Sequence, residues 1–387
     1  MITATDLQLI HCWQDSETTI EVTWSDNHKS QFHSIWLRDH CQCEDCVAPG
    51  TTQRLLDTSL LPSDLTLRSA GVNADGDLQL SWDPIHESRF KASWLRLNSY
   101  SNEDRQSRRI DRTLWNSELS TFPSGDFLDL ERDAEMTRWL SLVFDYGFAF
   151  LKNVPIETDA TEQFAGRIGY IRETNYGRMW DVVTQPSAAN LAYTSRELAV
   201  HTDNPYRDPV PGMQILHCLA APPRGGDSVL VDGIAVAEGL RRDHPLWFEI
   251  LTQCPRRFRY CDQQSDLQRS QPLIQVLGDE IIAVRYNSRS ASIVDLPFDV
   301  VEDFYRAYQE FGKRLYDERY QIRFRLQPGD LILFDNERIL HGRGGFDPND
   351  GLRHLRGCYL DRDTLASKLR VLKRQYALSK LDFEMRP

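Results

Sequence analysis

The sequence predicts a mainly β protein with flanking helices, divided into a small β-rich N-terminal domain and a larger C-terminal domain. The length of 387 residues suits two domains better than one. Strand patterns dominate the centre of the chain and helical patterns flank them, which favours a β-sandwich or barrel with helical additions over a parallel α/β sheet. Three of the eight cysteines fall within six residues of the N-terminal part, which sets that part of the chain apart.

Residues 1–100 form the predicted N-terminal domain. The stretches TTIEVTW and SQFHSIWL are rich in β-formers, and LTLRSAGVNADGDLQLSW indicates two strands around an Asn/Asp/Gly turn. Residues 101–125 are polar and poor in aliphatic side chains, so we interpret them as a linker. The larger domain is therefore expected to span residues 126–387.

The larger domain contains segments with the apolar spacing of helices and segments with the pattern of strands. DAEMTRWLSLVFDYGFAFLKNVP predicts a helix and then a strand, TEQFAGRIGYI a helix, MQILHCL and DSVLVDG strands, and EGLRRDHPLWFEIL a return to helix. QIRFRLQPGDLILFDNERILHGR indicates two strands around a Pro-Gly turn, and LASKLRVLKRQYAL a C-terminal helix. Apolar residues at helical spacing predict one buried helix face: Val301, Phe304, Tyr308, Phe311 and Leu315.

Charge and targeting signals narrow the classes of protein. The formal net charge of −12 weighs against nucleic acid as the main partner. No apolar run approaches the ~20 residues that a bilayer span requires. The N-terminus lacks a basic stretch followed by an apolar one and carries acidic residues early, which argues against secretory and mitochondrial signals. Because the cysteines cluster instead of spreading as pairs, we expect metal binding in a reducing compartment and hence a cytoplasmic protein. The lack of a long apolar run predicts that the protein has no membrane partner.

The pattern His201-Thr-Asp203 indicates a metal site. No other histidine among the ten is followed two residues later by a carboxylate. Alternate side chains of a strand project to one side, so both could reach one ion. A mononuclear Fe(II) site needs a second imidazole, for which His341 after the predicted strand DLILFDN is the candidate. A lone His-x-Asp is more often a surface turn, but Arg353, twelve residues after His341, could hold the distal carboxylate of 2-oxoglutarate.

The cysteine cluster indicates a second metal. Cys41, Cys43 and Cys46 would place three thiolates on one tight loop, and tetrahedral zinc needs a fourth ligand. His33 and His40 are close in sequence, but residues so near the loop cannot easily close a tetrahedron. Three structural cysteines or a redox pair are the alternatives.

Candidate functional aromatic residues occur in the stretches NYGRMWDV, ANLAYTS and RGCYLD. Three or four aromatic faces can enclose a quaternary ammonium group, which has no N–H to donate. From sequence alone, packing in a core is the more common role of such residues. The aromatic residues concerned are Tyr176, Trp180, Tyr193 and Tyr359.

The segments AVHTDNPY, GGDSVLVDG, FDNERILHGR and LRHLRGCYLDRD resemble the γ-butyrobetaine dioxygenase family of the Fe(II)/2-oxoglutarate oxygenases, and the resemblance covers almost the whole chain. It implies a double-stranded β-helix (jelly-roll) catalytic domain and a small zinc-binding N-terminal domain. It implies that His201 and Asp203, on the major strand of the barrel, and His341 bind iron, that Arg353 binds 2-oxoglutarate, and that His86 completes the zinc site.

The resemblance also implies an activity and a substrate site. Tyr176, Trp180, Tyr193 and Tyr359 would form a trimethylammonium cage, and Asn190 would help to hold the substrate carboxylate. The reaction would hydroxylate γ-butyrobetaine to L-carnitine with O₂, while 2-oxoglutarate is decarboxylated to succinate and CO₂. Fe(II), Zn(II) and 2-oxoglutarate are the implied cofactors, ascorbate is a further candidate, and a homodimer is the implied assembly.

Three rival functions remain at this stage. Trimethyllysine hydroxylases share the cage but carry an Asp where this chain has Asn190, which tilts the prediction to γ-butyrobetaine. Sulfonate dioxygenases share the iron motif but need no aromatic set. A zinc-ribbon interaction module with an inactive barrel is the non-enzymatic alternative. The segment from Arg285 is shorter than in some butyrobetaine enzymes, so the contacts of Asn287 and Arg289 stay open.

Overall fold

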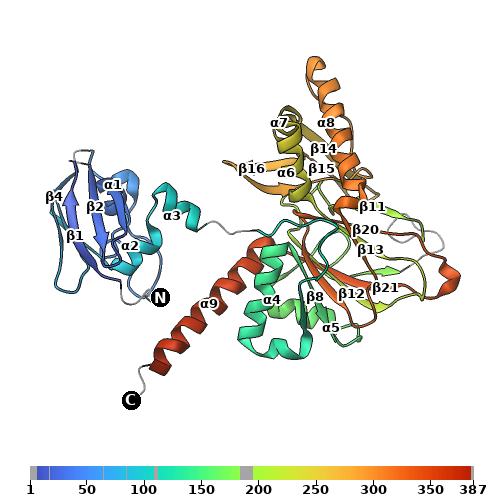
Figure 1. Cartoon of the computed structure of the whole chain (residues 1–387), viewed down its shortest axis with the longest axis horizontal. Coiled ribbons are helices and arrows are strands. Elements are labelled where there is room, and N and C mark those ends of the chain that lie inside the picture. Colours follow the sequence, from blue (N-terminus) through green and yellow to red (C-terminus); the bar gives the residue numbers. More distant parts are fainter. Residues whose placement is uncertain are drawn as a thin grey trace. The chain divides into compact units, whose positions relative to one another are not determined.

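The computed structural model of the chain describes residues 7–16, 18–63, 65–83, 85–108, 112–183 and 195–384. The chain forms two compact units, Met1–Ile110 and Asp111–Pro387 (Figure 1). The limits expected from the sequence, with a linker at 101–125, remain a prediction. That segment contains the helix α3, Asn102–Ser107, and the buried Trp115, whose indole Nε1 donates to the carbonyl of Tyr146 at 2.8 Å.

The N-terminal unit is built from two small antiparallel sheets with short helices. The first sheet has the order β1-β2-β3 and the second the order β4-β5-β6. Alternating burial along β2 and β5 directs Trp24 and Trp82 into a common core. The elements are β1 Leu9–Gln14, β2 Thr19–Trp24, β3 Lys29–His33, β4 Thr66–Val72, β5 Leu78–Asp83, β6 His86–Phe90, α1 Ser34–Asp39 and α2 Ala92–Asn98.

The β-rich character predicted for this unit is confirmed, with one local difference. SQFHSIWL changes from strand β3 to helix α1 at Ser34. The burial pattern explains the change, because Ser30 and Phe32 alternate into the core as a strand does, whereas Ser34 and Leu37 are buried at a spacing of three.

The C-terminal unit contains two larger sheets. One has seven strands in the order β10-β21-β12-β19-β8-β7, with β9 paired to β21, and the other has four in the order β11-β20-β13-β18. The first sheet comprises β7 Ser124–Asp126, β8 Phe148–Lys152, β9 Ile171–Arg172, β10 Trp180–Val183, β12 Met213–Ala220, β19 Leu331–Asp335 and β21 His354–Leu360. The second comprises β11 Leu198–His201, β13 Ser228–Asp232, β18 Gln321–Phe324 and β20 Ile339–Arg343.

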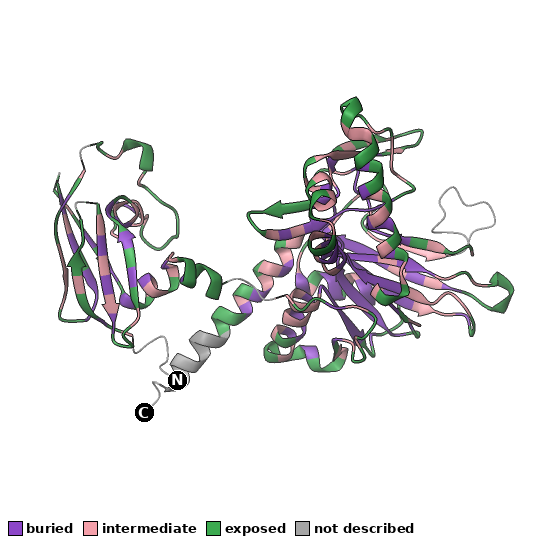
Figure 2. Cartoon of the chain, turned by 45° about the horizontal axis from the view of Figure 1, so that its top comes forward, coloured by how far each residue is buried: buried purple, intermediate pink, exposed green. Residues whose placement is uncertain are grey.

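The two sheets face each other across a shared core. Phe148, Ile332 and Phe334 of the seven-stranded sheet belong to the same buried cluster as Leu230 and Ile322 of the four-stranded sheet. Figure 2 shows these strands as the most continuously buried part of the unit. All strand pairs of the two sheets are antiparallel except β7 with β8 at one edge, and two sheets packed in this way make the jelly roll that was predicted.

The segment 321–343 forms three strands, where the sequence indicated two. The Pro-Gly turn joins β18, which pairs with β13, to β19, which pairs with β12 and β8. The turn therefore crosses from one sheet to the other and does not make a hairpin. Gly329 supports the crossing with a positive φ of 87°.

Helices cover the outer faces of both sheets. In Figure 1, α4 Asp133–Tyr146, α5 Ala160–Ile168 and α9 Arg362–Glu384 lie on the side of the seven-stranded sheet, and α6 Gly233–Asp243, α7 Pro245–Gln253 and α8 Phe298–Tyr316 on the side of the other. The predicted apolar face of α8 is confirmed, since Phe304, Phe311 and Leu315 are fully buried. Among the described residues, no helix is both long and apolar enough to cross a membrane.

Two hairpins complete the unit: β14 Pro255–Cys261 with β15 Asp266–Pro272, and β16 Ile274–Leu277 with β17 Glu280–Val284.

Candidate active site

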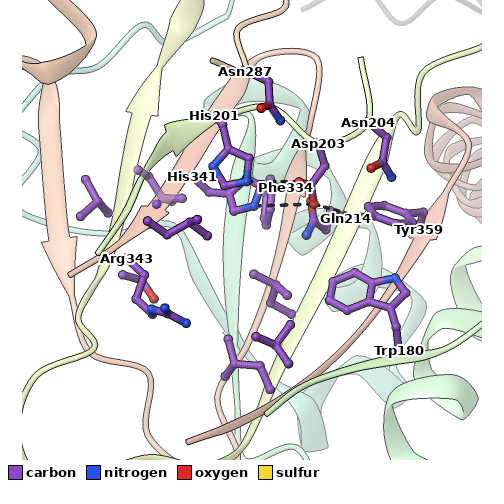
Figure 3. A pocket seen from close by; sticks show the side chains of 18 of the residues that line it. Trp180, His201, Asp203, Asn204, Gln214, Asn287, Phe334, His341, Arg343 and Tyr359 are labelled. Carbon is purple, nitrogen blue, oxygen red and sulfur yellow. Dashed lines mark hydrogen bonds and ion pairs between the residues drawn. The ribbon is translucent and has the colours of Figure 1, made fainter. Parts of the chain in front are cut away.

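Two histidines and one aspartate come together where β11 and β20 of the four-stranded sheet pair (Figure 3). His201, the last residue of β11, is the cross-strand partner of His341 in β20. Asp203 Oδ1 lies 3.2 Å from Nε2 of His201, and its Oδ2 lies 3.7 Å from Nε2 of His341. Donor atoms of the three residues all lie within 4.8 Å of one another. One metal ion could therefore contact all three side chains.

Asp203 does not lie on a strand, so the expectation that strand alternation aims both residues of His-x-Asp is wrong. β11 ends at His201, and the chain bends after it. The bend is held by Asn336, whose Oδ1 accepts from Asp203 N at 2.7 Å and whose Nδ2 donates to Asp203 O at 3.0 Å. Asn336 is fully buried, so this amide fixes the direction of the carboxylate.

The surroundings favour neutral imidazoles beside an ionised carboxylate. His201 Nδ1 lies 2.8 Å from the carbonyl oxygen of Ala199, which places the proton on Nδ1 and leaves Nε2 free to act as a ligand. Burial lowers the pKa of His201, and it lowers the pKa of His341 to about 3. Burial opposes ionisation of Asp203, but His341 and His201 more than offset it and bring its pKa below the usual range. This donor set fits mononuclear Fe(II).

A cavity of about 410 Å³ extends from the three donors. Figure 3 shows Arg343 and Trp180 on different sides of the two histidines, with Tyr359 and Gln214 beside Asp203. Arg353 lines the same cavity. Guanidinium groups and aromatic rings thus reach the space next to the same three donors.

Arg353 supplies a buried positive charge to this cavity. Its residue is 8% exposed, and burial together with the nearby Arg343 lowers its pKa to about 10. Within the described part of the chain, its guanidinium has no hydrogen bond or ion pair. A buried guanidinium without an anion is costly, so the arrangement suits the carboxylate of a ligand such as 2-oxoglutarate. Arg343 lies beside it and donates to the carbonyl of Arg196 at 2.7 Å.

Three of the four predicted aromatic residues line the cavity. The rings of Trp180 and Tyr359 are 5.3 Å apart, and Tyr176 lines the same space. The six-membered ring of Trp180 packs closely against β21, because a Cβ on Gly357 would come within 2.4 Å of it. Tyr193 and Asn190 lie outside the described residues.

Tyr359 also touches the metal donors. Its hydroxyl donates to Asp203 Oδ2 at 2.8 Å, and burial raises its pKa well above the usual value. The phenol therefore stays protonated and keeps a donor pointed at the carboxylate. Nothing in the sequence pattern indicated this contact, since the two residues are 156 positions apart.

Two further tyrosines, Tyr206 and Tyr260, line the cavity. Neither was predicted from the sequence to be a site residue. The hydroxyl of Tyr206 lies 3.2 Å from that of Tyr176 and donates to Asn204 Oδ1 at 2.7 Å. Tyr206 stands in the same AVHTDNPY stretch as the metal donors, which was the available signal for it. Tyr260 comes from the β14–β15 hairpin, and its sequence context carries no comparable signal.

The open question about segment 285–292 has a structural answer for Asn287. Its Oδ1 accepts from the backbone N–H groups of Arg289 and Ser290 at 3.1 and 3.2 Å, and its Nδ2 donates to the carbonyl of Thr202 at 2.9 Å. The Asn287 oxygen therefore stabilises its own loop, and its nitrogen connects this loop to Thr202, the residue between His201 and Asp203. Arg289 lines the cavity from the same loop.

The second group of donors lies in the N-terminal unit. Nε2 of His86, at the start of β6, lies 3.3, 3.7 and 3.7 Å from the sulfur atoms of Cys41, Cys43 and Cys46. A zinc tetrahedron with usual Zn–S and Zn–N bonds has S···N edges of about 3.5 Å, so this cluster fits zinc. Cys46 N donates to Cys43 O at 3.0 Å, which closes the tight loop. His40 is not part of this cluster.

The chain is similar to known proteins over most of its length. Residues 107–359 match the model of the taurine catabolism dioxygenase TauD, TfdA family, and residues 12–74 match the gamma-butyrobetaine hydroxylase-like N-terminal model. The chain is 37% identical to a gamma-butyrobetaine dioxygenase of Pseudomonas sp. (strain AK-1), over 92% of this chain and 94% of the relative. It is 34% identical to the mitochondrial trimethyllysine dioxygenase of Bos taurus, over 93% and 87%. The crystal structure of AAD-2 in complex with Mn(II) and N-oxalylglycine has the same fold, with a TM-score of 0.51 and 18% identity over 64% of this chain and 97% of that one.

Proposed function

Because the chain belongs to the taurine catabolism dioxygenase TauD/TfdA family, we propose that it is a γ-butyrobetaine hydroxylase that uses Fe(II) and 2-oxoglutarate and forms L-carnitine. The observation that carries this proposal is the single cavity shared by two histidines, one aspartate, a buried arginine and a group of aromatic rings. Only a substrate with both a cation and an oxidisable carbon makes use of all of them.

His201, Asp203 and His341 would hold the iron through two Nε2 atoms and the carboxylate. When bound there, iron(II) supplies the activation of O₂, coupled to decarboxylation of 2-oxoglutarate to succinate and CO₂. Asn336 and the Tyr359 hydroxyl keep the carboxylate aimed at the metal position. Arg353 would bind the distal carboxylate of 2-oxoglutarate and so orient its keto acid end toward the three donors.

The aromatic residues would hold the other substrate. A trimethylammonium group has no N–H, so ring faces are its best partners, each worth about 0.5–2 kcal/mol. Tyr176, Trp180 and Tyr359 would enclose it, together with Tyr193. Asn190 would help to hold the substrate carboxylate. With both ends of the substrate held, the distance between them selects the carbon that faces the metal.

Trimethyllysine hydroxylation is the second candidate, because relatives with that name match the chain almost as well. The sequence position that separates the two is Asn190. An Asp there would repel the carboxylate of γ-butyrobetaine and attract the amino group of trimethyllysine. A non-catalytic zinc-binding module is disfavoured by the close approach of all three metal donors.

Paired turnover of γ-butyrobetaine and trimethyllysine tests the substrate assignment. We expect the wild type to prefer γ-butyrobetaine. The Asn190→Asp variant should lose affinity for it by about ten-fold, because a like charge would face the carboxylate. Succinate formation and product mass are the measurements, with Asn102→Asp at an exposed position as the control and His201→Ala as the inactive reference. A wild type that prefers trimethyllysine would overturn the substrate while leaving the iron chemistry in place.

The proposal extends to the assembly and the location of the protein. We place it in the cytoplasm, as a homodimer that uses O₂, with ascorbate as a candidate reductant that keeps the iron ferrous. The family resemblance supports these points. Light scattering of the purified chain and turnover with and without ascorbate would test them.

A further inference from the structure

The hairpin of β14 and β15 contributes to the cavity although it lies outside both sheets. Tyr260 of β14 lines the cavity beside Tyr176 and Tyr206. Its ring stacks on that of Tyr206, with centroids 5.3 Å apart and planes 23° apart. It meets the ring of Tyr176 edge to face, at 5.9 Å and 62°. The three tyrosines therefore form one continuous aromatic wall.

The hydroxyl of Tyr260 is held by its own hairpin. It donates to Asp262 Oδ2 at 2.7 Å, and the same interaction raises the pKa of Tyr260 to about 12. Asp262 Oδ1 in turn accepts from the backbone N–H groups of Gln264 and Ser265, at 2.8 and 2.7 Å. Because the hydroxyl of Tyr260 is hydrogen-bonded within the turn, the aromatic ring is the part of this side chain that can contact a ligand in the cavity.

The hairpin is fastened to the segment that follows the metal donors. Gln271 Nε2 donates to the carbonyl of Pro205 at 2.7 Å, and Arg269 pairs with Asp208 at 2.8 Å. Arg269 also donates to the carbonyl of Arg207 at 3.1 Å. These contacts fix the hairpin across residues 205–208, so the position of Tyr260 is set relative to Tyr206 and, through it, to Tyr176.

We propose that Tyr260 is a further wall of the trimethylammonium site and sets its preference for a cation over a neutral group of the same shape. This inference rests on the proposed function, because it assumes a quaternary ammonium substrate. A π face attracts a cation by its quadrupole, and a neutral tert-butyl group of equal size gains only the apolar contact. Loss of the Tyr260 ring should therefore reduce the discrimination between the two groups, while Tyr176, Trp180 and Tyr359 retain part of it.

The test compares two ligands that differ by one atom. γ-Butyrobetaine and its carbon isostere 5,5-dimethylhexanoate, which keeps the carboxylate but has an uncharged tert-butyl head group, are titrated calorimetrically into the full chain loaded with Fe(II) and 2-oxoglutarate without oxygen. In Tyr260→Leu we expect affinity for γ-butyrobetaine to fall about three- to ten-fold and affinity for the isostere to stay near the wild-type value. Tyr260→Phe should behave as wild type, because the hydroxyl faces its own turn. Tyr170→Leu, at a tyrosine that is 91% exposed, is the matched control.

The outcomes separate the inference from the proposed function. Equal weakening of both ligands in Tyr260→Leu would show that Tyr260 acts by packing alone and would overturn the inference. The affinity for 2-oxoglutarate is the folding control and is expected to stay unchanged. A Tyr260→Leu variant that also loses affinity for 2-oxoglutarate has a collapsed hairpin, and the comparison of Tyr260→Phe with Tyr260→His then decides the role of the ring. If the wild type binds trimethyllysine instead, the substrate assignment fails, and the same comparison made with trimethyllysine and its carbon isostere still decides the role of Tyr260. A wild type that binds neither cation would refute both.

Discussion

At the scale of single residues, the arginines near the end of the chain show how strand geometry assigns roles. Arg353 lines the cavity just before β21. Arg356 is three positions further, and it pairs with Asp181 of the neighbouring strand β10 at 2.7 Å. Leu355 of β21 lines the cavity together with Arg353, whereas Arg356 pairs with Asp181 and does not line it, so Arg356 is excluded as a substitute for Arg353.

We expect Arg353→Ala to raise the KM for 2-oxoglutarate by about ten- to one hundred-fold, because a charge-assisted pair in a dry site is worth ~1.5–3 kcal/mol. Steady-state kinetics with 2-oxoglutarate as the varied substrate is the measurement. Arg356→Ala, three positions further along the chain, is the matched control and should leave this KM near its wild-type value. An unchanged KM in Arg353→Ala would assign the carboxylate to another group, with Arg343 first to examine.

At the scale of elements, sequence periodicity was enough for regular segments. The strands β12 and β13 and the helices α4 and α8 follow from apolar spacing, because each buries one consistent face. The bend that carries Asp203 could not be predicted in this way. Its direction depends on Asn336, 133 residues later, and no local pattern encodes such a contact. The same reason hides Tyr260, whose role depends on where its hairpin is fastened.

Asn336 lies in the turn between β19 and β20, and its removal should weaken both iron binding and the stability of the fold. Asn336→Ala removes hydrogen bonds to Asp203 N, Asp203 O and Pro211 O, and leaves these buried groups unpaired at ~1–3 kcal/mol each. We expect iron affinity to fall about ten- to one hundred-fold and the melting temperature to drop. Anaerobic metal titration and thermal unfolding are the measurements, and Asn349→Ala in the exposed 3₁₀ turn Pro348–Asp350 is the control. Wild-type iron affinity in Asn336→Ala would mean that Asp203 is held by its other contacts.

At the scale of the whole molecule, the chain carries two metal-ligand sets of different chemistry. The four donors of the N-terminal unit leave no open position for a substrate, so zinc there would be structural. The three donors of the C-terminal unit face a cavity, as a reactive metal requires. Sequence spacing predicted three of the four zinc donors, whereas His86 needed the family resemblance, because it approaches the loop from another sheet strand.

Elemental analysis should find about one zinc per chain, retained when a mild chelator removes the iron. Cys43→Ser should destabilise the N-terminal unit, since zinc binding to such a site contributes folding free energy directly. Iron binding to the C-terminal unit is expected to persist. Cys261→Ser, at an exposed cysteine, provides the comparison. Zinc-free protein that keeps its full melting temperature would contradict the assignment.

The hydroxyl of Tyr359 has a consequence for how the substrate range of this protein can evolve. The same side chain lines the cavity and donates to Asp203. A substitution that reshapes the pocket at this position also releases a metal donor, so it carries a penalty that is independent of the new substrate. Tyr176, Trp180 and Tyr260 have no contact with the three donors among the described interactions and can vary without that penalty. New substrate preferences are therefore most accessible through these three positions, with Tyr359 held constant by its second role.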